Sequence, residues 1–402
     1  MTTPGTTTAR TLGTTKRWRT YLVVASVLLG CGACEAAASW LYHTGWLDPF
    51  VVRVYEKTDP MGHFHRDRAL GYRLSPAPAR VTMLASDGQV LSRGLLRGNN
   101  FGLADLHDFK LKGDDTERRY AVLGDSMTAG RFIDRNWPES AEPRLAKRSA
   151  VPIRLYNMGI DGGGLGNWAH IVENFIAAQD MQLEGVIFAV ATDDLDRPFV
   201  WWDDTVHLAG SDPGSVAIHY DTTWDLHVDS FAGQAFVGSW MGVTREHYDA
   251  LLRGEWQPDL PRRPLQPYLA SRLWRVLANV WVSTAHASTP PPTTPREAAL
   301  RKELLAGLRR TLHDRHLAAL VLGLPGTDLE RARAFAAAIG ADYRDGGEGS
   351  ERDGYDEELK IKIDRHWNQA GSDHFAAAAA EHIETWLEAP RDPSRQPATA
   401  PR

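Results

Sequence analysis

Four short runs of apolar residues recur along the chain, and stretches of helical composition separate them. The runs are Tyr120–Leu123, Ile153–Tyr156, Val186–Ala191 and Leu317–Leu322. The helical stretches cover residues 138–148, 166–179, 296–315 and 328–339. Short continuous apolar runs are typical of strands buried on both faces, and their alternation with helices is typical of a parallel sheet. The sequence therefore predicts an α/β fold, with helices covering both faces of the sheet.

Two long segments interrupt this alternation. Residues 47–117 are rich in turn signals and are predicted to be an irregular lead-in that lies over the first strand. Residues 195–296 contain seven tryptophans and close with the stiff stretch STPPPTTP, so they are predicted to form an inserted subdomain or lid. The α/β domain is then built from residues 118–194 and 297–389, and residues 390–402 are predicted to be a disordered tail.

The N-terminal region has the pattern of an export signal. Residues 1–19 contain four basic side chains, and residues 20–46 are apolar over the length that spans a bilayer. This charge order predicts a transmembrane signal-anchor in the cell membrane, with the N-terminus in the cytoplasm and the large domain outside. A lipid-attachment site at Cys31 and a cleavage site at Ala36–Ala38 are open alternatives, and both also export the domain.

Composition excludes several other classes of function. The 402 residues carry a net charge of -6 with arginines scattered among acids, so a nucleic-acid partner is not expected. The only cysteines, Cys31 and Cys34, lie in the apolar segment, which excludes a disulfide or a cysteine metal site in the large domain. His63 and His65 are interpreted as surface residues, and no lysine-bearing glycine loop for phosphates occurs. Neither a metal nor a cofactor is therefore predicted.

The first apolar run ends at Gly124, Asp125 and Ser126, which places a serine hydroxyl at the edge of the sheet where ligands bind. A serine needs a base to take its proton and a third group to hold the base. Asp364 and His366 lie two residues apart near the other end of the chain, in KIDRHWNQAGSDHF. The order serine, aspartate, histidine is the one that α/β hydrolases use.

The helix after this histidine is predicted to start at the N-cap Ser372 and to stop at Pro390, with one apolar face. A loop in front of a terminal helix lets the carboxylate accept from one imidazole nitrogen while the other faces the serine. The residues alone thus favour nucleophilic catalysis by a serine.

Four segments, VLGDSMTAG, LYNMGIDGG, VIFAVATDD and DRHWNQAG, resemble in this order the sequence blocks of the SGNH (GDSL) hydrolase superfamily. The resemblance covers residues 69–388 apart from the insertion. It implies a flavodoxin-like three-layer α/β/α sandwich with an esterase or acyltransferase site. It also implies that Ser126 is the nucleophile, His366 the general base and Asp364 its orienting carboxylate. The N–H groups of Ser126 and Gly159 would then form the oxyanion hole.

The third block departs from the pattern of that family. Asp193 stands where the family has an asparagine that donates to the oxyanion. An ionised carboxylate only accepts hydrogen bonds, and the loss of one oxyanion donor costs roughly 100- to 1000-fold in rate. Three explanations stay open. Burial beside Asp194 keeps Asp193 protonated, the hydroxyl of Thr192 replaces it, or the site is weakened and serves in binding.

The substrate class predicted from these features is an O-acyl group on envelope or extracellular carbohydrate. Exposed aromatic side chains stack on sugar rings, and the tryptophan-rich insertion follows the third block directly. The form D-x-H-W-N of the last block also resembles acetyltransferases that modify polysaccharides, so an O-acyltransferase is the first alternative. A non-catalytic glycan-binding module on a membrane stalk is an alternative of another class.

Overall fold

The chain divides into two compact units, residues 1–49 with 258–292 and residues 50–257 with 293–402. The computed structural model describes residues 12–43, 51–55, 64–85, 90–113, 116–130, 132–197, 199–202, 216–220, 226–227, 234–236, 239–243, 295–347, 357–361 and 366–389.

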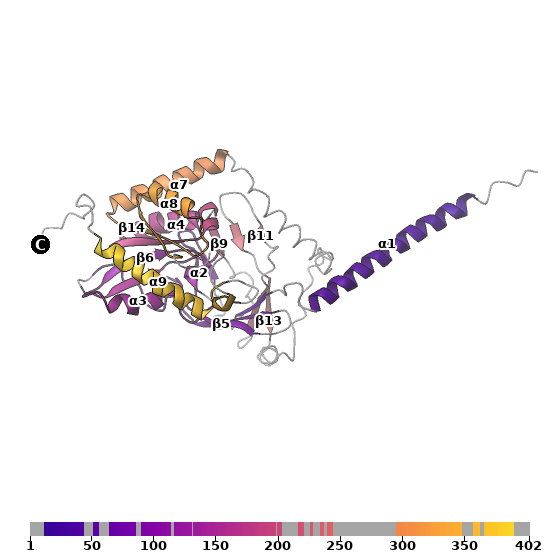
Figure 1. The fold of residues 1–402 in the computed structure, drawn as a ribbon, viewed down its shortest axis with the longest axis horizontal. Coiled ribbons are helices and arrows are strands. Elements are labelled where there is room, and N and C mark those ends of the chain that lie inside the picture. Colours follow the sequence, from indigo (N-terminus) through magenta and orange to yellow (C-terminus); the bar gives the residue numbers. More distant parts are fainter. Residues whose placement is uncertain are drawn as a thin grey trace, which may run out of the picture. The chain divides into compact units, whose positions relative to one another are not determined.

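The described part of the first unit is the helix α1 (Leu12–His43), drawn in indigo in Figure 1. Among the described residues, no helix combines the length and the apolar character needed to cross a membrane. The signal-anchor predicted over residues 20–46 therefore gains no support from α1 and stays a prediction. The predicted tail, residues 390–402, and most of the predicted lid, residues 195–296, lie outside the described residues.

The second unit is built on a five-stranded parallel sheet with the strand order β15-β14-β8-β6-β7. Its strands are β6 (Arg118–Leu123), β7 (Ile153–Asn157), β8 (Gly185–Val190), β14 (Ala318–Gly323) and β15 (Asp342–Asp345). Numbered along the chain, this order is 2-1-3-4-5, which is the flavodoxin-like arrangement. The four apolar runs of the sequence correspond to β6, β7, β8 and β14, and the predicted parallel α/β sheet is confirmed.

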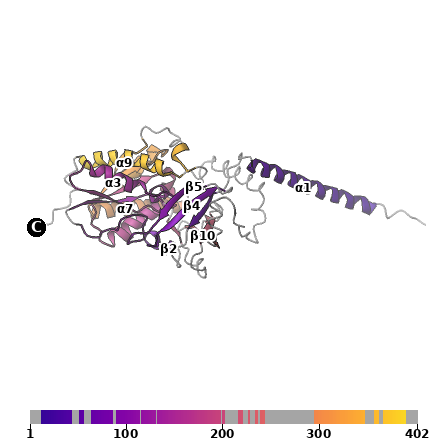
Figure 2. The same cartoon turned by 90° about the horizontal axis from the view of Figure 1, so that it is seen from below.

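Helices cover both faces of this sheet, as Figures 1 and 2 show. They are α3 (Trp137–Ala146), α4 (Leu165–Ile171) with its π-helical continuation η1 (Val172–Ala177), α7 (Pro295–Asp314), α8 (Leu329–Ile339) and α9 (Gln369–Glu388). Alternate residues of β6 point to opposite faces, as a strand requires. Tyr120 shares one buried cluster with Trp137 of α3, whereas Ala121 shares the other with Trp168 of α4. The predicted three-layer architecture follows from these two cores.

The lead-in is not irregular throughout, because five strands form within it. It contributes the hairpin of β2 (Phe64–Asp67) and β3 (Gly71–Leu74), together with β1 (Val51–Tyr55), β4 (Ala79–Ala85) and β5 (Val90–Leu96). Strands of the insertion complete the second sheet in the antiparallel order β13-β10-β1-β4-β5, with β10 (Val216–Tyr220) and β13 (Ser239–Val243). The insertion also forms β9 (Val200–Trp202), β11 (Leu226–His227) and β12 (Gln234–Phe236). Turn residues between short strands concealed this pairing in the sequence.

The lead-in hairpin also holds the segment that follows β7. The hydroxyl of Tyr72 accepts a hydrogen bond from the N–H of Asp161 at 3.3 Å. The side-chain amide of Asn167 donates to the carbonyl of Leu70 at 3.2 Å. Both contacts join residues about 90 or more positions apart, so the lead-in fixes a loop at the edge of the parallel sheet.

Candidate active site

Ser126 is the first residue of α2 (Ser126–Ala129), a single helical turn that follows β6 directly. The carboxylate of Asp125 caps this turn by accepting from the N–H of Met127 at 2.9 Å. Gly130 ends it with a φ of 63°, a value that favours glycine. The strand that follows β6 in the chain, β7, lies on one side of β6, and the next strand, β8, lies on the other. Ligands bind at such a switch point, beyond the carboxyl ends of the strands. Ser126 therefore stands where this fold presents its ligand site.

His366 is the partner of this serine. Its Nε2 atom lies 2.8 Å from the Oγ atom of Ser126, although the two residues are 240 positions apart. The carbonyl of His366 accepts from the N–H of Ile361 at 2.7 Å, and its ring packs edge-on against Phe132, with 5.4 Å between ring centres. The backbone and the ring are thus both held. Asp364 lies outside the described residues, so its orienting role stays a prediction.

The N–H of Gly159, which was predicted to be an oxyanion donor, already has an acceptor within the protein. Its N–H already donates to the Oδ1 atom of Asn157 at 2.9 Å, within buried structure. An added Cβ atom would lie 2.5 Å from the backbone nitrogen of Ala129, so no side chain fits there. Glycine at this position lets the segment after β7 pack closely against α2.

Gly162 lies three residues after Gly159, in the same segment that follows β7. It lies in a turn closed by the N–H of Gly163, which donates to the carbonyl of Ile160 at 2.7 Å, and its φ of 71° favours glycine. The N–H of Ile160 donates to the carbonyl of Gly124 at 3.1 Å, so this turn runs beside the serine loop. Within the described part of the chain, the N–H groups of Ser126 and Gly162 have no protein acceptor. In the sequence, three consecutive glycines after β7 indicate this turn.

The turn after β8 carries the two residues that the sequence offers in place of the missing asparagine, Asp193 and Thr192. In this 3-10 turn, η2 (Thr192–Asp196), Asp193 is exposed and Asp194 is buried. The hydroxyl of Thr192 accepts from the N–H of Asp328 at 2.6 Å. Asp328 follows β14, which pairs with β8 on the side opposite to β6. The Thr192 hydroxyl is therefore engaged on the β14 side of β8, away from the strand that carries Ser126.

Hydrogen bonds from buried side chains hold α2 in place. The side-chain amide of Asn157 donates to the carbonyls of Thr128 at 2.8 Å and Ala104 at 2.9 Å. The indole N–H of Trp137 donates to the hydroxyl of Thr128 at 3.3 Å. Because these groups come from the lead-in, β7 and α3, the turn that carries the serine is fixed by three separate parts of the chain.

The side chain of Gln369, three residues after His366, holds this part of the site in place. Its carbonyl oxygen accepts from the N–H groups of Asp134 at 3.1 Å and Arg135 at 3.0 Å, and its amide donates to the carbonyl of Arg135 at 2.9 Å. This side chain joins the start of α9 to the loop that follows α2. The N-cap of α9 is Asn368, which accepts from Gly371, and not the predicted Ser372, which is buried in the helix.

Glu139 introduces a pH dependence of stability near the site. It is buried at the start of α3, and burial, followed by the charge of Asp105, raises the pKa of its carboxyl to about 7. The unfolded chain ionises from about pH 4.5, whereas the folded protein holds this proton until about pH 7. Stability is therefore lost as the pH rises between these values, by about 3 kcal/mol for this group.

We expect Glu139→Gln, which cannot ionise, to remove most of that loss. Urea unfolding at pH 5 and pH 8 measures it, and the exposed Glu381→Gln is the matched control. Parallel pH profiles for wild type and Glu139→Gln would contradict this account of the buried carboxyl.

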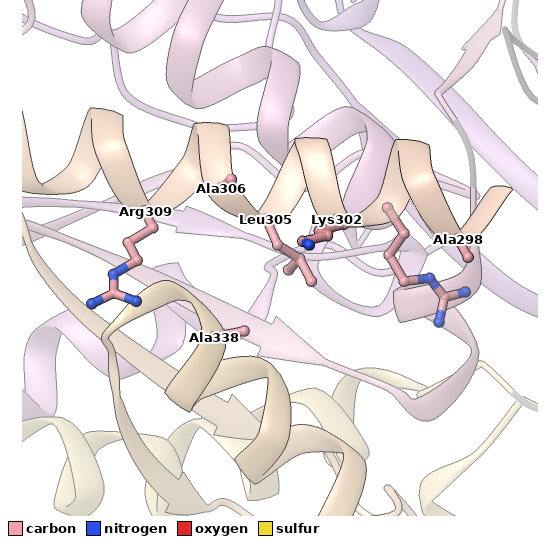
Figure 3. A pocket seen from close by; sticks show the side chains of 7 residues that line it. Ala298, Lys302, Leu305, Ala306, Arg309 and Ala338 are labelled. Carbon is pink, nitrogen blue, oxygen red and sulfur yellow. The ribbon is translucent and has the colours of Figure 1, made fainter. Parts of the chain in front are cut away.

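A groove between α7 and α8 is separate from these residues. It has a volume of about 480 Å³, and Figure 3 shows the side chains on its walls. They are Ala298, Arg301, Lys302, Leu305, Ala306, Arg309 and Ala338. None of these is a predicted site residue.

No protein-family model and no curated protein sequence matches this chain. Solved structures resemble it at low identity. TesA is 12% identical over 67% of this chain and 99% of its own, with a TM-score of 0.35. A lipase/acylhydrolase from Enterococcus faecalis is 10% identical over 68% and 100%, with a TM-score of 0.30. AlinE4, an SGNH-hydrolase family esterase, is 14% identical over 69% and 100%, with a TM-score of 0.29. Values of this size establish neither an activity nor a substrate for this chain.

Proposed function

We propose that the chain is a serine-dependent ester hydrolase that works through an acyl-enzyme on Ser126. The observation that carries the proposal is the 2.8 Å contact between the Oγ atom of Ser126 and the Nε2 atom of His366. A histidine nitrogen at this distance can take the hydroxyl proton as the oxygen attacks a carbonyl carbon. The position of the pair at the ligand-binding edge of a flavodoxin-like sheet supports the same conclusion.

The reaction then proceeds in two halves. Ser126 adds to the ester carbonyl while His366 takes its proton, and the N–H groups of Ser126 and Gly162 stabilise the negative oxygen of the tetrahedral intermediate. His366 next protonates the leaving alcohol, and the acyl group stays on Ser126. Water, deprotonated by His366, releases the acid in the second half. Asp364 would orient the imidazole and stabilise its charged form.

We further propose that the ester is an O-acyl group on carbohydrate outside the cytoplasm. Support comes from the tryptophan-rich sequence of residues 195–296 and from the basic and apolar order of residues 1–46, which favours export. A sugar hydroxyl could take the place of water in the second half, which would make the chain an O-acyltransferase. The same serine and histidine serve both reactions, so the acceptor has to be found by experiment.

Covalent labelling tests the proposal directly. We expect a fluorophosphonate to form one adduct per chain, because this reagent requires an activated serine, and mass spectrometry should place it on Ser126. Ser126→Ala should stay unlabelled. Ser149→Ala is the matched control, since the Ser149 hydroxyl donates to the carbonyl of Val151 at 2.6 Å and belongs to no such pair. A folded wild-type protein that takes up no reagent would refute the proposed activity.

A further inference from the structure

The side chain of Arg197 contacts all three loops of the proposed site. Its NH1 atom lies 3.4 Å from Asp125 in the loop after β6 and 2.7 Å from the Oδ1 atom of Asp194 in the turn after β8. The same atom donates to the carbonyl of Gly163, in the turn after β7, at 3.2 Å. One nitrogen thus connects the loops that carry Ser126, Gly162 and Asp193.

The charges of this cluster make the arginine necessary. Asp194 is buried completely, and burial together with repulsion from Asp125 raises the pKa of its carboxyl, an effect that Arg197 opposes. Burial disfavours the charged guanidinium, but the attraction of Asp194 and Asp125 outweighs it and raises the pKa of Arg197. The contact at 2.7 Å is an ion pair without hydrogen-bond alignment, because the Oδ1 atom of Asp194 has no hydrogen-bond partner. Without Arg197, two neighbouring carboxylates would be left without their cation.

The backbone around Arg197 also contacts the segment that follows β7. Its carbonyl accepts from the N–H of Gly166 at 3.2 Å. A Cβ atom added to Gly164 would lie 2.2 Å from the carbonyl oxygen of Asp194 and 2.8 Å from the Cβ atom of Arg197. The turn after β8 and the segment after Gly162 therefore touch through their backbones. Arg197 sits at this contact and fixes it from both its side chain and its main chain.

We propose that Arg197 is a positioning residue that holds the Gly162 turn, and with it the N–H proposed to bind the oxyanion, in register with Ser126. The inference rests on the proposed hydrolase function and deepens it. Arg197 touches no reacting atom in this arrangement. It acts by fixing the Gly163 carbonyl and the Asp125 cap together, and a displacement of about 1 Å in such a site can cost roughly 100-fold in rate.

Replacing Arg197 in the full-length protein tests this role. We expect Arg197→Ala to lower kcat for p-nitrophenyl acetate about 100-fold with little change in KM, and added guanidinium to restore part of the rate. Arg197→Lys keeps the charge on a shorter side chain, so it should stay folded and lose about tenfold. Arg331→Ala is the matched control, because it removes the ion pair between Arg331 and Asp196 in the same turn but contacts neither Asp125 nor Gly163.

Hydrogen exchange separates a failure of this inference from a failure of the proposed activity. We expect the peptide covering residues 158–166 to exchange faster in Arg197→Ala and Arg197→Lys, and unchanged in Arg331→Ala. If wild type hydrolyses no ester, the activity is wrong and the exchange result still decides the positioning role. Unchanged exchange, or a kcat loss equal to that of Arg331→Ala, would overturn the assignment of Arg197.

Discussion

Ser126→Ala is expected to lower kcat for p-nitrophenyl acetate by at least about 1000-fold, because no other group described at this edge can attack the ester. The hydroxyl removed contacts His366 at 2.8 Å, and the serine itself is only half-buried. We therefore expect the melting temperature to stay within a few degrees of wild type. Initial rates on the full-length protein, with circular dichroism of each variant, measure both effects.

His366→Ala provides the second half of this test. Since serine and histidine act as one unit, the double variant Ser126→Ala with His366→Ala should be no slower than either single variant. Additive losses would show that the two side chains act independently, and the pair would then not be a nucleophile with its base. Ser149→Ala, whose hydroxyl bonds to Val151 and not to His366, should keep the wild-type rate.

The sequence predicted the parallel sheet well because its strands are buried on both faces. Every residue of β8 is buried, and a wholly apolar run of that length has few other interpretations. The outer strand β15 was missed because its residues, Asp342 to Asp345, are mostly polar and only partly covered. The antiparallel sheet was missed in part because β1 of the lead-in pairs with β10, more than 100 residues later. Such partners cannot be read from local patterns.

The sequence predicted only part of the site, because the other residues act through contacts between distant parts of the chain. Ser126 and His366 belong to motifs whose residue types follow from the chemistry, and the structure brings them together. Gly159 and Gly162 could not be told apart in NMGIDGGG, because the difference is whether the N–H group already has an acceptor. The N–H of Gly159 donates to the side chain of Asn157, whereas Gly162 lies in the turn closed by Ile160 and Gly163. Arg197 and Gln369 were missed because they act through contacts that only the folded chain creates.

Asp193→Asn is expected to raise kcat about 10- to 100-fold. Asp193 is exposed in the turn after β8, next to the strand that carries Ser126, and it stands where the SGNH resemblance expects an amide donor. The asparagine would remove a negative charge that opposes the oxyanion and would add a hydrogen-bond donor. Losing such a donor costs roughly 100- to 1000-fold in other enzymes, and a gain should be smaller because the site was not shaped around it.

Asp193→Ala separates the two contributions, since it removes the charge without adding a donor. If repulsion dominates, Asp193→Ala should match Asp193→Asn, and added salt should speed up wild type but not the variants. If the donor dominates, only Asp193→Asn should gain. Asp196→Asn is the matched control, because Asp196 lies in the same turn and pairs with Arg301 and Arg331. A loss of rate in both Asp193 variants would mean that this carboxylate itself binds substrate, and that a cationic or hydroxyl-rich group lies against it.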